Sequence, residues 1–181
     1  FRKLKKKIIV KIILASKSKV RKKILEENGI SCMVEPANID EDLVKESLLK
    51  EGATSGLITK NLAELKANKI SQKKNGEIVL GADSVIDLKG VIISKPSDRK
   101  EALKILQKLN GKKHHLISSV CISKNGSMIW NCTDKAGLTM KQMSNDELKS
   151  YLTKIKNENL YAYNVYQIEG EGRSLFSKIE G

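Results

Sequence analysis

The chain has 181 residues, 40% of them hydrophobic, which fits one globular domain and excludes a chain that is disordered throughout. The formal net charge is +13, but residues 1–25 hold 11 of the 34 basic residues and no acid, and the remainder carries 23 basic against 21 acidic side chains. Because the excess is local and only 4% of residues are aromatic, a nucleic-acid-binding surface built on base stacking is disfavoured.

The cysteines and the hydropathy pattern indicate a cytoplasmic protein. Cys32, Cys121 and Cys132 show neither metal-ligand spacing nor a C-x-x-C pair, so we expect reduced thiols. No apolar run reaches transmembrane length, and Lys11 interrupts the apolar stretch that follows the basic tail at residues 1–7. We therefore expect no membrane association, and we expect either end of the sequence to have been trimmed.

Strands and helices are expected to alternate through the first half of the chain. Predicted core contacts on its helices are Val20, Ile24, Leu25, Leu57, Leu62, Leu65 and Ile70. In order, we expect a strand at Ile8–Leu14, a helix at Ser18–Asn28 stopped by Gly29, a strand at 31–36, a short helix after the acidic turn at 38–42, and an amphipathic helix at 54–71.

The second half adds two hairpins to this pattern. We expect a strand at 77–88 that passes through a special turn, a hairpin at Lys89–Gly90, a helix at 97–111 capped by Ser97 or Asp98, a long hairpin at 115–141 turning at Asn125–Gly126, and a helix at 144–155. The fold class predicted is α/β, with a mixed, partly antiparallel sheet flanked by helices.

The stretch ILASKSKVRKK, residues 13–23, indicates an anion-binding junction. A predicted strand ends at Leu14, and a hydroxyl-rich turn leads into a cationic helix with no acid before Glu26. Helix N-termini present free amides and a positive dipole end, which suit phosphate. The alternative is an ordinary helix cap formed by Ser16 or Ser18, and on this stretch alone that alternative is the better founded.

Several charged residues form a second candidate set. Asp83 follows an apolar stretch and a glycine, where a carboxylate can hold a divalent metal or accept a proton from water; the alternative is a turn aspartate. Lys95 precedes a proline that holds the backbone extended, while Lys66 lies on a helix, and both could be solvated lysines. Glu41 and Asp42 could be capping acids. Together these residues suit a metal-dependent enzyme acting on a polyphosphate.

Two other chemistries are disfavoured. His114 and His115 are adjacent, so on a strand they point to opposite faces, and neither has a Cys or His at ligand spacing. We therefore expect a structural role for these histidines and not a metal centre. A serine nucleophile at position 16 or 18 would need a base, and both histidines lie in a distant hairpin.

Read in order, these stretches resemble the Maf family of nucleotide pyrophosphatases, also called septum-formation inhibitor Maf proteins. LASKSKVR (14–21) is similar to the family's L-A-S-x-S-P-R-R, and GADS (81–84) to its G-A-D-T or G-S-D-Q. The match runs along essentially the whole chain and continues with NIDED (38–42), LAELKA (62–67), SKP (94–96), LNGKKHHLISSV (109–120) and YQIEGEG (166–172).

The resemblance implies a single Maf-like domain over residues 1–181, two-lobed with a central cleft as in ITPase-like proteins, and with the family's C-terminal end absent. It implies hydrolysis of a nucleoside triphosphate to the monophosphate and pyrophosphate with Mg²⁺ or Mn²⁺, and a role in removing modified nucleotides or in septum formation; a homodimer is left open. Asp83 would be the proton acceptor, with Glu41 as its partner at the metal. Phosphate contacts would come from Ser16, Arg21, Lys66 and Lys95.

Three positions depart from the subgroups of the family. Val20, Ser84 and Glu169 stand where dTTP/UTP-type enzymes have Arg, Thr and Gln and where the 7-methyl-GTP type has Trp, Gln and Glu. Only Glu169 matches either group, which favours a purine. Two rivals are kept: a non-enzymatic regulator or nucleic-acid binder using the basic arm, whose binding would fall steeply with salt, and a phosphatase that releases inorganic phosphate.

Overall fold

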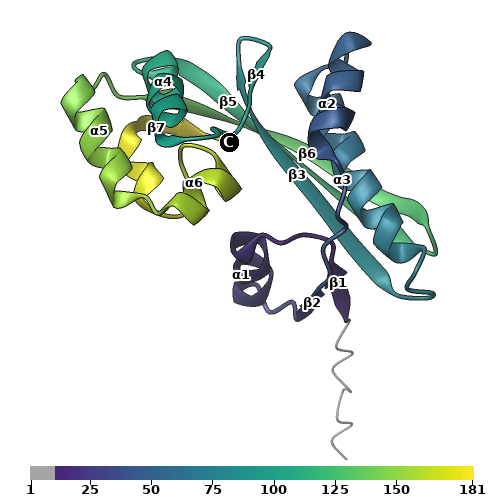
Figure 1. Cartoon of the computed structure of the whole chain (residues 1–181). Helices are drawn as coiled ribbons and strands as arrows, with labels where there is room; N and C mark the ends of the chain where they lie inside the picture. Colours follow the sequence, from purple (N-terminus) through teal and green to yellow (C-terminus); the bar gives the residue numbers. More distant parts are fainter. Residues whose placement is uncertain (1–10) are drawn as a thin grey trace, which may run out of the picture. The chain divides into compact units, whose positions relative to one another are not determined.

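The structure, a computed structural model, describes residues 11–181; residues 1–10, which contain the basic tail and the start of the expected first strand, lie outside the described part. The elements alternate much as expected (Figure 1). They are β1 (Ile12–Leu14), α1 (Lys19–Glu27), β2 (Cys32–Val34), α2 (Glu41–Lys50), α3 (Ser55–Ser71), β3 (Ile78–Leu88), β4 (Val91–Ile93), α4 (Arg99–Leu109), β5 (Lys113–Lys124), β6 (Ser127–Met140), α5 (Asn145–Lys154), α6 (Asn157–Tyr163), the 3₁₀ helix η1 (Glu171–Leu175) and β7 (Phe176–Glu180).

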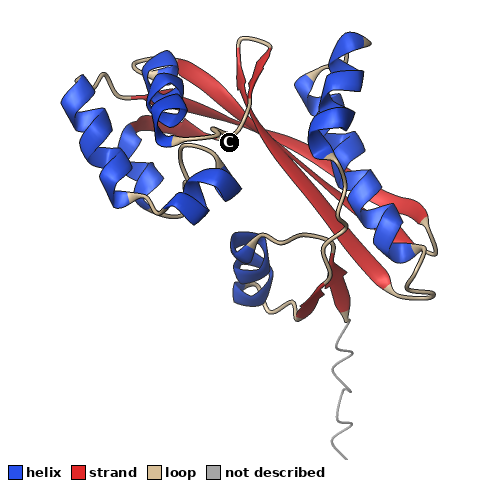
Figure 2. Ribbon diagram, viewed as in Figure 1, coloured by secondary structure: helices blue, strands red, loops and turns tan. Residues whose placement is uncertain are grey.

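The strands of the described chain form one mixed sheet (Figure 2). Its order is β2-β1-β3-β5-β6-β7, with β4 paired to β3. β1 runs parallel to both β2 and β3, whereas β4 is antiparallel to β3 and β7 is antiparallel to β6. The predicted α/β class with a mixed, partly antiparallel sheet is therefore confirmed.

The chain divides into two compact units. Within the described residues, the first unit comprises 11–52, 60–83 and 119–132, and the second unit comprises 53–59, 84–118 and 133–181. This division agrees with the two lobes expected, while the cleft between lobes stays a prediction. Several segments of the chain contribute to each unit.

The core of the first unit is built from small side chains. Figure 1 shows α3 lying along β3, and its buried face uses Ala63, Ala67 and Ile70 against Val79. The expectation that Leu65 enters the core is wrong: it is 42% exposed, and Leu57 at the start of α3 is 47% exposed. Alanines form the contact line instead, because they let the helix approach the sheet closely.

Gly81 sets the distance between β3 and α3. A Cβ at this position would lie 2.1 Å from the Ala63 carbonyl oxygen and 2.8 Å from the Ala67 amide nitrogen. These are backbone atoms, which cannot move aside as the end of a flexible side chain can. The glycine therefore permits a contact between the backbones of β3 and α3 that is too close for any side chain at this position.

Helix α1 buries little. Val20 and Leu25 are half-buried, but Ile24, expected on the same inner face, is 44% exposed. Gly29 ends the helix as predicted, with a φ of +75° in the left-handed region. The helix is stabilised instead by its Ser18 cap and by ion pairs of Lys22 and Lys23 with acids one turn later.

The second unit has a larger apolar core, around which α4, α5, α6 and β7 are grouped (Figure 1). α4 contributes Leu106 and Leu109, and its Asp98 cap accepts a hydrogen bond from the Glu101 amide as the sequence predicted. The elements α6, η1 and β7 were not predicted. Their sequence lacks a clear period, and tertiary packing fixes them: Leu160, Leu175 and Phe176 enter the core.

His114 lies inside this core. Its Nε2 is 2.9 Å from the Tyr166 hydroxyl, and its ring packs near Tyr166 and Phe176. The structural role expected of this histidine is confirmed, although its Nδ1 is buried without a hydrogen-bond partner in the structure. Burial lowers the pKa of His114 to about 4, so the ring is neutral at physiological pH.

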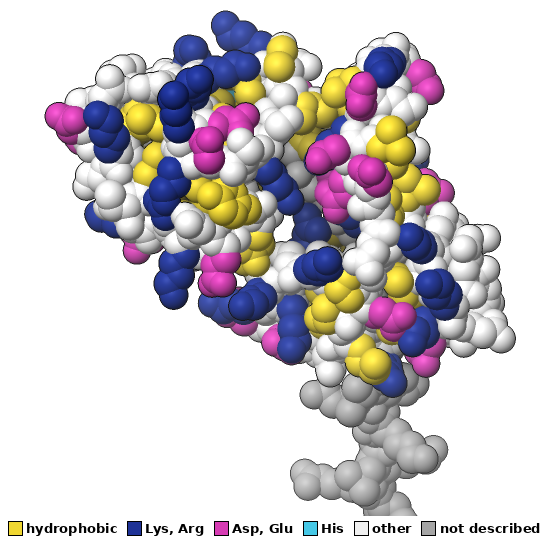
Figure 3. All heavy atoms as spheres, in the orientation of Figure 1, with side chains coloured by type: hydrophobic (Ala, Val, Ile, Leu, Met, Phe, Trp, Pro, Cys, Tyr) yellow, Lys and Arg dark blue, Asp and Glu magenta, His cyan; other side chains and the backbone are white. Residues whose placement is uncertain are grey.

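Charged side chains of both signs are interspersed over the face drawn in Figure 3. The exposed i,i+4 pairs are worth only a few tenths of a kcal/mol each, about 0.3–0.5. Within residues 11–181, no helix combines the length and the apolar character needed to cross a membrane.

The first prediction concerns Gly81. We expect Gly81→Ala to lower the free energy of unfolding by about 1–3 kcal/mol, because the methyl group would overlap the α3 backbone. Urea unfolding measures this change. Gly56→Ala, which adds a methyl group to α3 itself, is the control. Only Thr133 Cγ2, at 3.9 Å, lies near the added atom, so no loss of stability is expected. Equal stability of the two variants would contradict the close-packing role of Gly81.

The second prediction concerns pH. The folded protein holds His114 with a pKa near 4 against an ordinary 6.5, so the unfolded chain binds more protons between these values. This contribution to stability is present above pH 6.5 and is lost as pH falls towards 4, by about 3 kcal/mol in total. Urea unfolding of wild type and His114→Gln across this window tests it. A stability difference between the two that does not change with pH would refute the assignment.

Candidate active site

The two serines in the turn between β1 and α1 make different hydrogen bonds. Ser18 caps α1 by accepting a hydrogen bond from the Arg21 amide at 3.2 Å. Ser16 is buried, and its Oγ accepts from the Ser18 amide and from Arg21 Nη1, each at 3.2 Å. The capping alternative thus applies to Ser18, whereas Ser16 belongs to the turn itself. The first turn of α1 contains no acid that would neutralise its positive end.

Arg21 connects this junction to β3. Its Nη1 donates to the carbonyl oxygen of Ala82 at 2.7 Å, directly before Asp83 in the chain. The same carbonyl lies 3.5 Å from Lys66 Nζ. A backbone oxygen therefore holds two cationic side chains beside the predicted catalytic carboxylate.

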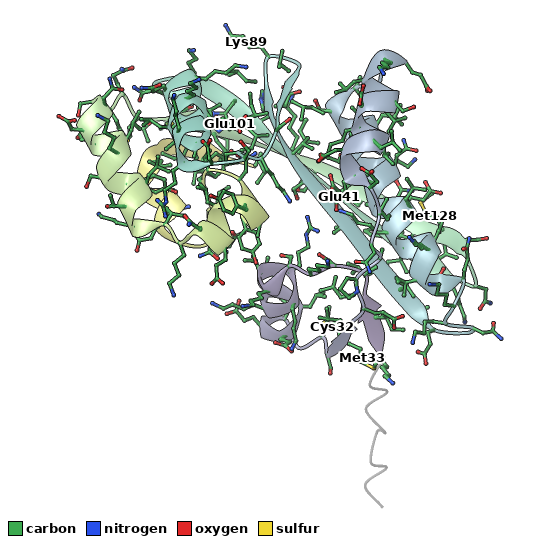
Figure 4. All side chains as sticks on the ribbon, viewed as in Figure 1. Cys32, Met33, Glu41, Lys89, Glu101 and Met128 are labelled. Atoms are coloured by element: carbon green, nitrogen blue, oxygen red, sulfur yellow. The ribbon has the colours of Figure 1, made fainter. Side chains whose placement is uncertain are left out.

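Lys66 forms the centre of the site. Its Nζ lies 2.8 Å from Asp83 Oδ1 and 2.8 Å from Glu41 Oε1. Lys66 and Asp83 are buried, and the Glu41 side chain is 34% exposed. Glu41 begins α2 (Figure 4), after the Asp40 cap. Three elements, α2, α3 and β3, thus each contribute one charged group to this cluster.

Asp83 lies within a strand, which corrects the sequence interpretation. It was expected at a strand end followed by a special turn, but β3 is continuous from Ile78 to Leu88. The register explains why Asp83 still occupies a special place: β1 pairs with residues 78–80 of β3, and β4 pairs with residues 86–88. Asp83 falls between the two paired stretches, on the same strand face as Gly81, which meets α3.

One oxygen of this carboxylate is unsatisfied. Asp83 Oδ2 is buried and has no hydrogen-bond partner in the structure. Buried polar atoms are nearly always paired, and the exceptions concentrate where a ligand, an ion or a water completes the site. The Oδ2 atom is therefore the natural point for a proton or a cation to bind.

The donor set fits a hard divalent cation only in part. Carboxylate oxygens are the ligands that Mg²⁺ and Mn²⁺ prefer, and Mg²⁺ often binds through one or two carboxylates plus substrate phosphates. Among residues 11–181, no group of three or more His, Cys, Asp or Glu side chains is placed to hold a metal alone. Asp83 and Glu41 are thus two candidate ligands, and further ligands would have to come from a bound molecule.

The other predicted residues have the following places. Val20 lies on α1, half-buried, next to Arg21. Ser84, Lys95 and Glu169 belong to the second unit. Ser84 is exposed and its Oγ lies 2.9 Å from that of Ser118. Lys95 is exposed and follows a backbone fixed by Asn164, whose side-chain amide donates to the Ile93 and Ser94 carbonyls.

Glu169 is exposed in a tight turn between α6 and η1. Gly172 makes this turn possible, because a Cβ there would lie 2.6 Å from backbone atoms of Gln167. The turn borders a cavity of about 250 Å³ in the second unit, which is also lined by α5 and α6 residues such as Tyr151, Asn159 and Tyr163. The glycines of the EGEG stretch are therefore turn residues.

The thiols take no part in this site. Cys32 is half-buried, Cys132 is exposed, and Cys121 is buried; all three are free. Burial raises the pKa of Cys121 to about 11, which keeps it a neutral thiol. The expectation of reduced cysteines stays a prediction.

Sequence reasoning missed three contributors. The Ala82 carbonyl has no side-chain signal at all. Gly81 could have been found from its place before Asp83, since a glycine in a strand often marks close backbone approach. Lys69, three residues after Lys66, donates to the Asn38 carbonyl at 2.7 Å and so ties α3 to the loop that leads to Glu41.

Sequence comparison relates this chain to known proteins along its whole described length. A family model described as "Maf-like protein" matches residues 11–181. A "Nucleoside triphosphate pyrophosphatase" of Pelagibacter ubique is 73% identical over 96% of this chain and 89% of its own length. A "7-methyl-GTP pyrophosphatase" of Brucella abortus is 37% identical over 95% of this chain and 86% of its own.

Among solved structures, a HAM1 protein from Coxiella burnetii overlaps 74% of each chain with a TM-score of 0.48 and 14% identity, an overlap too partial to assign a fold. The family assignment comes from sequence. The family model covers every described residue, and relatives at 73% and 41% identity, the second from Roseobacter denitrificans, each cover more than nine-tenths of this chain. This chain belongs to the Maf family.

Proposed function

We propose that this protein is a nucleoside triphosphate pyrophosphatase, which hydrolyses a nucleoside triphosphate to the monophosphate and pyrophosphate. The observation that carries the proposal is the buried Asp83 carboxylate, with one oxygen on Lys66 and the other unsatisfied. The names of its relatives support the same reaction class. The enzyme is thus a hydrolase acting on acid anhydrides.

Asp83 acts as the proton acceptor. Its Oδ2 takes a proton from water as the water oxygen bonds to the α-phosphorus and the bond from that phosphorus to the bridging oxygen breaks, releasing pyrophosphate. In the structure Lys66, at 2.8 Å from Oδ1, orients the carboxylate by charge and hydrogen bonding. This role requires a carboxylate that is fixed but not fully satisfied, which is what Oδ2 provides.

The anionic phosphates are bound by the junction of β1 and α1. Ser16, Arg21 and the first-turn amides of α1 contribute donors and positive potential. Lys66 adds charge next to them, and the phosphate contact that the family resemblance implies for Lys95 stays a prediction. Phosphoryl transfer needs mainly positioning and charge neutralisation, so a cationic, hydroxyl-bearing turn suffices.

Asp83 and Glu41 would hold a divalent cation, Mg²⁺ or Mn²⁺. When bound, that cation neutralises charge on the triphosphate and on the departing pyrophosphate. Each of the two acids would supply a carboxylate oxygen to it, and the incoming phosphates would complete its ligands.

The third prediction concerns Asp83. We expect Asp83→Asn to lower kcat at least a hundredfold with an intact fold, since an amide neither accepts this proton nor binds a metal well. Asp87→Asn is the matched control: it is buried on the same strand, its carboxylate serves Ser55 and the Gly90 amide, and it should keep kcat. An Asp83→Asn enzyme with more than about a tenth of wild-type kcat would exclude the acid–base role.

Product analysis separates this proposal from a phosphatase. A panel of nucleoside triphosphates with Mg²⁺ or Mn²⁺ should yield monophosphate and pyrophosphate in equal amounts. Release of inorganic phosphate together with the nucleoside diphosphate would support the phosphatase instead. Nucleotide binding that gives no product would support a non-enzymatic role.

The fourth prediction concerns the base. Glu169 is proposed to face the nucleobase, and a carboxylate accepts hydrogen bonds only, which suits the N–H donors of guanine or 7-methylguanine. We expect kcat/KM for 7-methyl-GTP or GTP to exceed that for UTP or dTTP, and Glu169→Gln to shift this ranking by about tenfold. Glu171→Gln, two residues on, is the control. A preference for UTP or dTTP, or an unchanged ranking, would refute this role.

The wider expectations stay predictions of the sequence. These are the removal of modified nucleotides, a link to septum formation, a cytoplasmic location and a homodimer. The single-domain assignment over residues 1–181 stays a prediction as well.

A further inference from the structure

Lys66 occupies the position between the two acids. Its three N–H donors have three acceptors in reach: Asp83 Oδ1 and Glu41 Oε1, each at 2.8 Å, and the Ala82 carbonyl oxygen at 3.5 Å. The side chain is 8% exposed, so water takes little part in its solvation. The ammonium group is therefore fully engaged within the protein before any nucleotide is bound.

Lys66 contacts the two acids that are also proposed to hold the divalent cation, Asp83 and Glu41. Asp83 Oδ2 is buried without a hydrogen-bond partner. An ammonium group and a divalent cation in contact with the same two carboxylates would repel each other strongly at such short range.

We infer that Lys66 is an internal counter-ion that competes with the divalent cation for Asp83 and Glu41. In the nucleotide-free protein the lysine holds the two acids in place. When the cation binds, the ammonium group leaves the carboxylates and becomes available to an anionic substrate. This inference rests on the proposed function for the identity of the substrate, but the competition itself can be measured without nucleotide.

The competition predicts that removal of the lysine strengthens metal binding. A lysine that serves only structure or only phosphate binding would leave the affinity for metal alone unchanged or weaker when it is removed. A competing lysine would tighten it. We expect Lys66→Met to bind Mn²⁺ at least about tenfold more tightly than wild type, while its kcat falls.

The experiment is calorimetric titration of MnCl₂ into nucleotide-free protein, with Mn²⁺ paramagnetic resonance as an independent readout. Lys60→Met is the matched control, because it removes the same charge from the same helix, α3. Its affinity for Mn²⁺ should stay within about twofold of wild type. Unchanged or weaker Mn²⁺ binding by a folded Lys66→Met would overturn the inference.

A measurement on the wild type avoids dependence on the variant's folding. A buried ammonium group with three acceptors exchanges its protons slowly, so ¹⁵N-labelled lysine should give an observable Lys66 Nζ signal. Adding MgCl₂ without nucleotide should shift or abolish that signal. A signal unchanged at saturating Mg²⁺ would refute displacement. Failure of the proposed function would appear separately, as a wild type that yields no pyrophosphate.

Discussion

The ion pairs of Lys66 with Asp83 and Glu41 are the constraint on which the first unit depends. Burying charged groups is expensive unless they are paired, and removing one partner of a buried pair typically costs about 3–5 kcal/mol. The pairing requires α3 to approach β3 within backbone contact, which Gly81 and the alanines of α3 allow. It also requires α2 to begin at Glu41, which the Asp40 cap and the Lys69 contact with Asn38 secure. Packing that looks structural is thus arranged around a charged group.

The sequence predicted the charged cluster of Asp83, Lys66 and Glu41 better than its setting. These three residues could be named because each stands in a short stretch that resembles a motif of the Maf family. The strand that carries Asp83 was expected to turn there, but β3 continues through Asp83 as a member of the sheet between β1 and β5. The Ala82 carbonyl could not have been predicted, since a backbone acceptor leaves no mark in a sequence.

The buried faces of the helices show a second limit of prediction from sequence. Leucine spacing predicted Leu57 and Leu65 as core residues of α3, yet Ala63 and Ala67 occupy the contact line and both leucines are largely exposed. Periodicity weighs large side chains most, and fails where a close approach favours small ones. In α4, where Leu106 and Leu109 fill an ordinary core, the same reasoning succeeded. The segment after residue 155 was missed because packing against that core, rather than local pattern, determines α6 and β7.

The repeated passage of the chain between its two units has a consequence for biosynthesis. The first unit contains the β1–α1 turn, Lys66 and Asp83, but it also includes residues 119–132, which follow a long stretch of the second unit. A nascent chain therefore cannot complete the first unit when Asp83 leaves the ribosome; it must wait until β5 and the start of β6 have emerged. Domains that fold as chain segments are released one after another during synthesis. Here the first unit can be completed only after a large part of the second has been synthesised, and a fragment cut at any single peptide bond would leave at least one of the units unfinished.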